Sequence, residues 1–156
     1  MTTQREFAVP KDKQLVTVHV IGGETNTGNI FLEYAPEALT LHQKVKLFLE
    51  DGNRFFPLAA EGMPPTFINK ERVSMLEMTV SDEEPPSYHL MHIEDITSLF
   101  TDGTALSGEL LAEVPKEKTR LSDCLNLSES FLSVKKGKTL CFINKSSIQQ
   151  VIYSKG

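Results

Sequence analysis

The chain contains one pattern of residues twice, and this repeat limits the possible folds more than any other feature. The segment Phe67-Ile68-Asn69-Lys70 recurs identically as Phe142-Ile143-Asn144-Lys145, and the apolar run that opens at Gly28 corresponds to the run that opens at Gly108. Order and hydrophobic phase are kept, while the changes in length fall in turn-like stretches, where loops absorb them. We therefore expect a duplicated module.

The segment between the copies is acidic and rich in proline. It reads Ser-Asp-Glu-Glu-Pro-Pro-Ser over residues 81–87, a composition typical of a linker. We predict a first module over residues 1–80, a linker over 81–87 and a second module over 88–156. Because each module is small for a core of its own, we expect the two to pack on each other or on another chain.

Each module is predicted to consist mainly of strands. Residues 15–21 are dense in β-branched side chains and end at Gly22-Gly23, and a second run rich in Ile, Phe and Tyr follows Gly28. This predicts a bent antiparallel pair. In the second copy, Asp102-Gly103 supplies the corresponding turn, because both residue types tolerate positive φ.

The middle of each module is predicted to contain one or two helical turns, followed by further strands. Apolar residues recur there at i, i+3 and i+4, namely Val45, Phe48 and Leu49 in the first copy and Leu121, Cys124 and Leu125 in the second. Residues 55–59 and 131–134 are expected to form the next strand. The Phe-Ile-Asn-Lys segments open a final hairpin, with Asn at its corner because Asn readily enters the left-handed region.

Three segments resemble the Sm-like small barrel: residues 16–23, the run that opens at Gly28, and residues 67–73. The second copy is also similar to a bacterial family of unassigned function, through Asp123-Cys124-Leu125-Asn126, Phe131-Leu132 and Ile143-Asn144-Lys145. The Sm-like resemblance implies a mainly β fold of two tandem five-stranded, strongly bent antiparallel sheets, each with a short helical segment. In that family such sheets often assemble edge to edge into rings and bind single-stranded RNA.

The Asn-Lys pairs are the candidate ligand or RNA contacts. They are Asn69 with Lys70 and Asn144 with Lys145, at the corner where Sm-like proteins typically carry Arg-Gly. Lysine can meet a phosphate and asparagine a base edge. A duplicated turn that simply keeps its turn residues explains the same pattern.

Net charge argues against bulk binding of polyanions. The charge of −5 disfavours a protein that coats nucleic acid or anionic membrane, so we expect no DNA and no membrane partner. No apolar run approaches the length of a membrane span, and the first residues lack the apolar region of a secretion signal. Two cysteines without a CxxC spacing favour a reducing compartment, so we expect a cytoplasmic protein with Cys124 and Cys141 buried.

No motif for a metal, a cofactor or catalysis emerges. His89 and His92 have metal-like helical spacing, but on a strand they point to opposite faces. Glu33 and Glu113 occupy equivalent positions that a solvent-facing strand explains, and His42 is expected to be exposed. The spacing of the glycines fits neither the Walker phosphate-binding loop nor the dinucleotide-binding motif, and there is no Gly-x-Ser-x-Gly nucleophile elbow. We therefore expect no cofactor and no enzymatic activity.

The leading hypothesis is a non-enzymatic interaction or scaffold protein of bacterial type, with a protein partner or self-association. Duplicated strand modules with exposed sheet edges and no chemical site motivate it. The alternative is a single-stranded RNA-binding Sm-like protein that uses Asn69, Lys70, Asn144, Lys145 and the C-terminal lysines.

Overall fold

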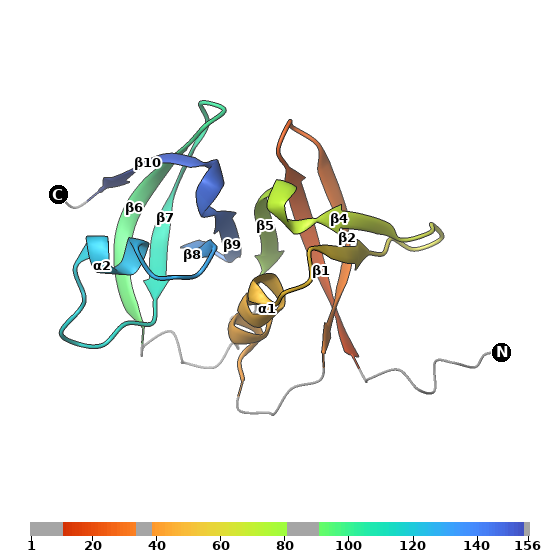
Figure 1. Cartoon of the computed structure of the whole chain (residues 1–156), viewed down its shortest axis with the longest axis horizontal. Coiled ribbons are helices and arrows are strands. Elements are labelled where there is room, and N and C mark those ends of the chain that lie inside the picture. Colours follow the sequence, from red (N-terminus) through yellow and green to blue (C-terminus); the bar gives the residue numbers. More distant parts are fainter. Residues whose placement is uncertain (1–10, 34–38, 81–90, 155–156) are drawn as a thin grey trace.

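The computed structural model describes residues 11–33, 39–80 and 91–154, and within them the chain is mainly β (Figure 1). The first set of elements is β1 (Lys11–Val20), β2 (Thr25–Glu33), α1 (Leu41–Glu50), β3 (Phe55–Leu58), β4 (Thr66–Asn69), a 3₁₀ turn (Lys70–Arg72) and β5 (Val73–Thr79). The second set is β6 (His92–Phe100), β7 (Ala105–Ala112), α2 (Leu121–Leu125), β8 (Phe131–Lys136), β9 (Thr139–Asn144), a 3₁₀ turn (Lys145–Ser147) and β10 (Ile148–Tyr153). The predicted linker, residues 81–87, lies outside the described residues.

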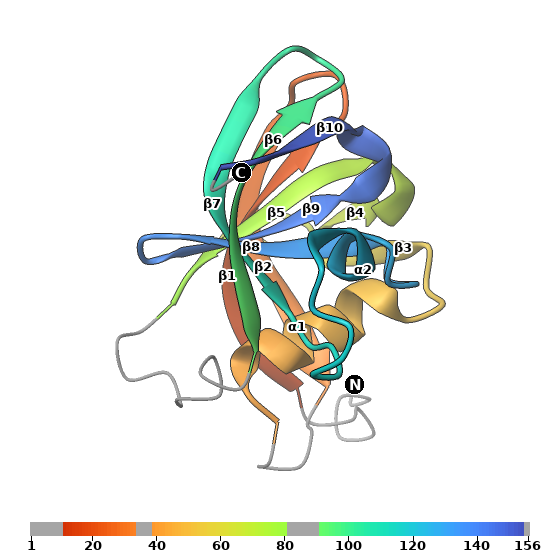
Figure 2. The same cartoon turned by 90° about the vertical axis from the view of Figure 1, so that its left-hand side faces the viewer.

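The strands pair antiparallel and follow the same order in both sets. One eight-stranded sheet runs β10-β6-β7-β8-β9-β5-β1-β2, and β3 pairs with β4 in a second sheet. An isolated bridge between Asn29 and Ala59 connects β2 to β3. The first set therefore reads β5-β1-β2-β3-β4 and the second β10-β6-β7-β8-β9. Figure 2 shows the strong bend, with β8 and β9 running across the direction of β6 and β7.

The described strands form no closed barrel, so the Sm-like barrels stay a prediction. Predicted strands, turns and helical segments nevertheless occur where the sequence indicates them. Gly103, in the turn between β6 and β7, has φ of +93°, a conformation that glycine adopts without steric cost. Among the described residues, no helix combines the length and apolar character needed to cross a bilayer.

The pairing registers of the two sets also match. Val16 lies opposite Gly28 in the β1–β2 pair, and Ile96 lies opposite Gly108 in the β6–β7 pair. Both glycines sit where the next strand crosses closely: a Cβ on Gly28 would lie 2.8 Å from the carbonyl oxygen of Ala59. A Cβ on Gly108 would lie 2.7 Å from Val134 Cγ1 and 2.9 Å from the carbonyl oxygen of Lys135. The bend therefore requires glycine at both positions.

Helix α1 begins at a capping box. The Gln43 backbone N–H donates to Thr40 Oγ1 at 3.1 Å, and the Thr40 N–H donates to Gln43 Oε1 at 3.0 Å. These bonds satisfy two of the backbone donors that a helix start leaves open. One face of α1 buries Val45 and Leu49, as the i, i+4 spacing predicts. The helix then ends before Asp51-Gly52-Asn53.

The asparagine corners differ from the prediction. Asn69 has φ −81° and ψ 117°, and Asn144 has φ −67° and ψ 122°, so both backbones are extended rather than left-handed. Each side chain instead caps the 3₁₀ turn that follows, with Asn69 Oδ1 accepting from the Glu71 N–H and Asn144 Oδ1 accepting from the Ser146 N–H, both at 3.0 Å. The left-handed prediction is wrong because a capping residue satisfies the turn through its side chain and keeps β-region dihedrals.

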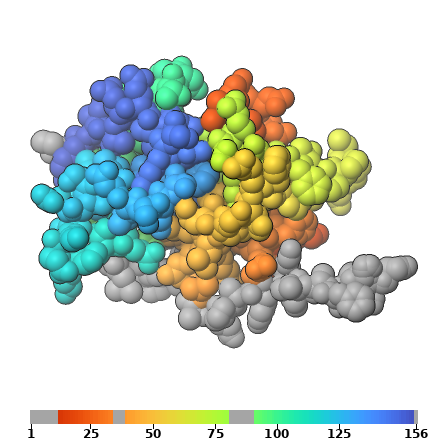
Figure 3. All heavy atoms as spheres, viewed as in Figure 1, coloured from red at the N-terminus to blue at the C-terminus, as the bar shows by residue number. Residues whose placement is uncertain are grey.

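The two sets are joined by a strand pair and a shared core. β5 pairs antiparallel with β9, with Leu76 opposite Phe142. The larger core cluster combines residues of β1, β2, α1 and β5 with Leu111, Phe131, Leu140 and Phe142 of the second set. Figure 3 shows α1, in orange, packed directly against the blue and cyan second set. The two sets of elements therefore pack against each other through one strand pair and one shared core cluster.

Candidate interaction surface

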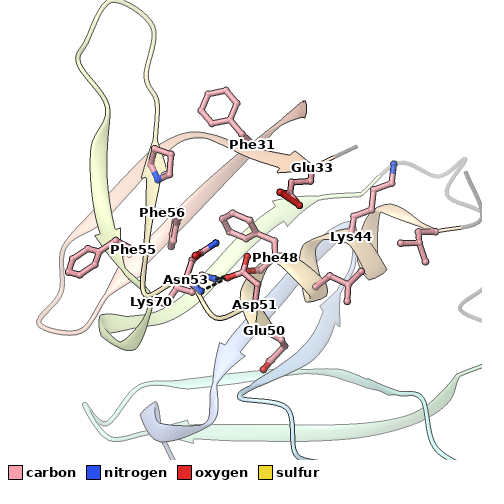
Figure 4. A pocket seen from close by; sticks show the side chains of 13 residues that line it. Phe31, Glu33, Lys44, Phe48, Glu50, Asp51, Asn53, Phe55, Phe56 and Lys70 are labelled. Atoms are coloured by element: carbon pink, nitrogen blue, oxygen red, sulfur yellow. Dashed lines mark hydrogen bonds and ion pairs between the residues drawn. The ribbon is translucent and has the colours of Figure 1, made fainter. Parts of the chain in front are cut away.

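A pocket of about 550 Å³ opens on the first set, between β2, α1, β3 and the corner that follows β4 (Figure 4). Four aromatic side chains line it, from three different elements: Phe31, Phe48, Phe55 and Phe56. The ring of Phe48 meets the ring of Phe56 edge-on, with centroids 5.1 Å apart. Charged and polar side chains complete the lining, so the pocket combines aromatic rings with polar groups.

Lys70 closes one end of this pocket. Its Nζ donates to the Phe48 carbonyl oxygen at 2.6 Å and to Asp51 Oδ1 at 2.5 Å, and it lies 5.1 Å from the centroid of the Phe48 ring. The side chain is buried. A lysine in this position satisfies a carbonyl at the end of α1, where the helix leaves acceptors open.

Two acidic groups of the pocket, Asp51 and Glu50, make contacts within the chain. Asp51 Oδ1 accepts from the Asn53 N–H at 2.8 Å in addition to Lys70. The carboxylate of Glu50 accepts from the backbone N–H groups of Ser130 and Phe131 at 2.9 to 3.1 Å. These contacts hold the loop and the two sets together, whereas Glu33 and Lys44 place charged groups in the lining beside the aromatic rings.

The apolar lining of the pocket continues onto the β3–β4 pair. Phe67 lies opposite Pro57, and Phe55 lies two residues from Pro57, so all three side chains share one face of the pair. Phe55 is 55% exposed and Phe67 63% exposed. We define the open surface as these three residues together with the pocket residues Phe31 and Leu47.

The equivalent surface of the second set is covered. By strand order and register, Phe131 corresponds to Phe55 and Phe142 corresponds to Phe67. Phe131 is 5% exposed and Phe142 0%, because both belong to the core shared with the first set. The same residue type is thus buried in one set and exposed in the other.

Helix α1 covers the equivalent surface of the second set. His42 is hydrogen-bonded to Ser133 Oγ at 2.8 Å, and Lys46 forms ion pairs with Glu129 at 2.5 Å and with Glu113 at 4.0 Å. These contacts place one face of α1 over β8 and the end of β7. Pro57 and Glu33 of the first set correspond to Ser133 and Glu113. None of the described helices covers these two residues, and the pocket lies there instead.

The predicted exposure of His42 is wrong. Its ring is almost fully buried between α1 and the second set, with its centroid 5.6 Å from that of Phe142. Burial, and then repulsion from Lys46, lower the pKa of His42 from 6.5 to about 4. The imidazole is therefore neutral at physiological pH. Packing between the sets, which a single copy of the pattern does not reveal, causes the burial.

The four predicted RNA contacts lie at two separate corners, and their side chains make contacts within the chain. Lys145 Nζ donates to the carbonyl oxygen of Leu127 at 2.5 Å, much as Lys70 does to Phe48, and burial lowers the pKa of Lys145. Asn144 Nδ2 donates to the Val73 carbonyl oxygen at 2.9 Å, across the junction of the two sets. Asn69 caps its 3₁₀ turn.

The remaining predicted site residues lie apart from the open surface or at its margin. His89 lies outside the described residues, and His92 on β6 is paired with Glu94. Within residues 11–33, 39–80 and 91–154, no group of three or more His, Cys, Asp or Glu side chains could hold a metal ion. Glu33 and Glu113 are exposed, as expected. Both cysteines are buried, as predicted, and burial raises the pKa of Cys141 to about 12.

The open surface is what sequence reasoning missed. A signal was present, because Phe55 and Phe131 align, as do Phe67 and Phe142. Aromatic residues at matching strand positions indicate a shared role in packing. They do not indicate which copy has a neighbour.

No protein-family model, curated protein or solved structure matches the chain.

Proposed function

We propose that the chain is a non-enzymatic interaction protein of two tandem, duplicated Sm-like modules, and that it binds a polypeptide through the open surface. The observation that carries this proposal is the contrast between the two sets. Phe55 and Phe67 are exposed, whereas their counterparts Phe131 and Phe142 are buried by contact with a neighbouring module. Phenylalanine at the same two strand positions is thus used for packing in one half of the chain.

Physical chemistry supports a polypeptide as the partner. Contiguous exposed apolar surface is uncommon on monomers and marks interaction sites. Aromatic side chains dominate the binding energy of protein interfaces. Among the strands that the structure describes, β4 has a neighbour on one side only, so its other side can accept a further strand through backbone hydrogen bonds. Two buried free thiols fit a reducing, cytoplasmic compartment.

A protein partner is favoured over RNA by the contacts of the lysines. Binding RNA through Lys70 and Lys145 would require both to leave carbonyl groups at the ends of α1 and of the α2 segment. The net charge of −5 also opposes bulk attraction to phosphate.

The test compares affinity purification of the wild type with a double variant, Phe55→Ser with Phe67→Ser. The matched control is Leu15→Ser on β1, since Leu15 is 59% exposed but lies outside the open surface. We expect a protein that the wild type and the control retain in stoichiometric amount and the double variant loses. Retention of nothing by the wild type, or equal retention by all three, would contradict the proposal.

A further inference from the structure

We propose that the occupant of the open surface is an amphipathic α-helix of a different protein, docked as α1 docks on the second set within this chain. This inference rests on the proposed function and names the form and the charge pattern of the partner. The contact that α1 makes serves as its template, because the two sets carry the same elements in the same order.

Helix α1 makes its polar contacts with the second set through one face. The residues that supply them are His42, Lys46 and Glu50, spaced four apart. Residues at this spacing lie above one another on a helix. In the same order, they meet a hydroxyl, two carboxylates and two backbone N–H groups: Ser133 Oγ, Glu129 with Glu113, and the N–H groups of Ser130 with Phe131. The docked face therefore runs from a neutral residue through a basic one to an acidic one.

The apolar part of this contact is also present on the first set, and there it is open. The core cluster that holds Val45 and Leu49 of α1 includes three residues of the second set, Leu111, Phe131 and Phe142. By register, their counterparts are three members of the open surface, Phe31, Phe55 and Phe67. A helix with an apolar stripe covers all three rings at once, and burial of apolar surface is the main favourable term in association.

A carboxylate that faces Lys46 has a counterpart on the first set. Glu113 lies 4.0 Å from Lys46, and its counterpart Glu33 is exposed and lines the pocket (Figure 4). Asn53 stands in place of Glu129, and its amide oxygen can still accept a hydrogen bond from a cation. Lys44, a cation of the same lining, lies 3.8 Å from Asp12, which offsets its charge. A lysine or arginine of the partner helix is therefore favoured beside Glu33.

Two other positions differ from the template and set the rest of the pattern. Pro57 replaces Ser133, the hydroxyl partner of His42, so an apolar residue is favoured at that place of the helix. Arg54 replaces Ser130 but keeps a backbone N–H there, and its side chain is 63% exposed. An acidic residue is favoured beside it, as in α1. The partner helix thus carries an apolar, a basic and an acidic residue at i, i+4 and i+8.

Neither of the helices that the structure describes is free to supply this partner, which argues against a second copy of the chain. Helix α1 already covers the second set of its own chain. Helix α2 has five residues, too few to reach from i to i+8. A helix of another protein is therefore required.

The probe is a synthetic peptide with the sequence of residues 40–51 and the substitution His42→Leu, which gives it the pattern derived above. A hydrocarbon staple in place of Lys44 and Phe48, on the opposite face, holds the peptide helical, because isolated helices of this length are marginal in water. Fluorescence anisotropy with the full-length chain is expected to show saturable binding of one peptide per chain. The unstapled peptide is expected to bind more weakly, since it loses more conformational freedom on docking.

Three variants of the chain locate the contact. Phe55→Ser with Phe67→Ser is expected to lower the affinity at least about ten-fold, because the apolar contact of two rings is lost. Leu15→Ser, the matched control, leaves it unchanged. Glu33→Lys is expected to lower it about five-fold, since attraction to the peptide's lysine becomes repulsion. Lys46→Glu in the peptide then restores binding to the Glu33→Lys chain and weakens binding to the wild type. Circular dichroism verifies that every variant is folded.

Absence of binding overturns the inference, as does equal binding to the double variant, equal or tighter binding of the unstapled peptide, or a charge exchange that restores nothing. Self-association of the wild type that the double variant abolishes, seen by analytical ultracentrifugation, would assign the surface to a second copy instead. These results leave the proposed function standing if affinity purification still retains a protein through Phe55 and Phe67. Loss of that retention as well removes both proposals.

Discussion

Acidification should weaken the junction between the two sets of elements through His42. The neutral imidazole is buried against Ser133 and Phe142, and burial together with Lys46 lowers its pKa from 6.5 to about 4. In the unfolded chain the group returns to its ordinary pKa. Between these two values the unfolded state binds more protons than the folded state, so stability is present above about pH 6.5 and is lost as the pH falls toward 4.

The magnitude follows from the shift. Each pKa unit corresponds to about 1.4 kcal/mol, so His42 lowers the free energy of unfolding by about 2 kcal/mol between about pH 8 and about pH 5. The loss levels off at about 3 kcal/mol below the folded-state pKa. For a domain whose total stability is about 5 to 15 kcal/mol, this is a large fraction.

The assay is urea unfolding followed by far-UV circular dichroism, because the chain has no tryptophan. The comparison variant is His42→Gln, which can still hydrogen-bond Ser133 Oγ but does not titrate. All other side chains are common to both proteins, so their contributions cancel in the difference. We expect the wild type to lose about 2 kcal/mol more than the variant on acidification. Equal pH dependence of the two proteins, or a His42 ring that titrates near 6.5 by NMR, would refute the reasoning.

Three further predictions follow from packing. Gly108→Ala should destabilise the fold by about 1–3 kcal/mol in urea unfolding, since its Cβ has no room, whereas Gly52→Ala, with nothing within 4 Å, should be neutral; equal effects would contradict this. Lys70→Met should cost about 1–3 kcal/mol in thermal or urea unfolding by removing the donor to the Phe48 carbonyl at the end of α1 and one of the donors to Asp51, and an unchanged stability would contradict the capping role. The thiol of Cys141 should react with a thiol reagent only as the chain unfolds, because it is buried and its pKa is raised to about 12; fast labelling of the folded protein would show that it is accessible.

Interactions between residues close together in the sequence made much of the fold predictable. The glycine at the bend, the turn glycines and the β-branched runs act through backbone sterics within a few residues, so the elements appear where the pattern indicates. The Asn-Lys corner was located correctly, but its dihedrals were not. Asn69 could either adopt a left-handed backbone or keep an extended backbone and cap the next turn with its side chain. The conformation of the following residues decides between these two arrangements, which are close in energy.

The candidate site was predictable only in part. The sequence by itself determined that Phe67 and Phe142 hold the same position in the same strand pattern, because the segments that carry them are identical. Only the tertiary structure decided that Phe142 is buried and Phe67 exposed, and it likewise decided the burial of His42. Burial depends on which surface lies next to a side chain, and that neighbour, here β5 and α1 placed against β9 and β8, comes from a segment more than sixty residues away.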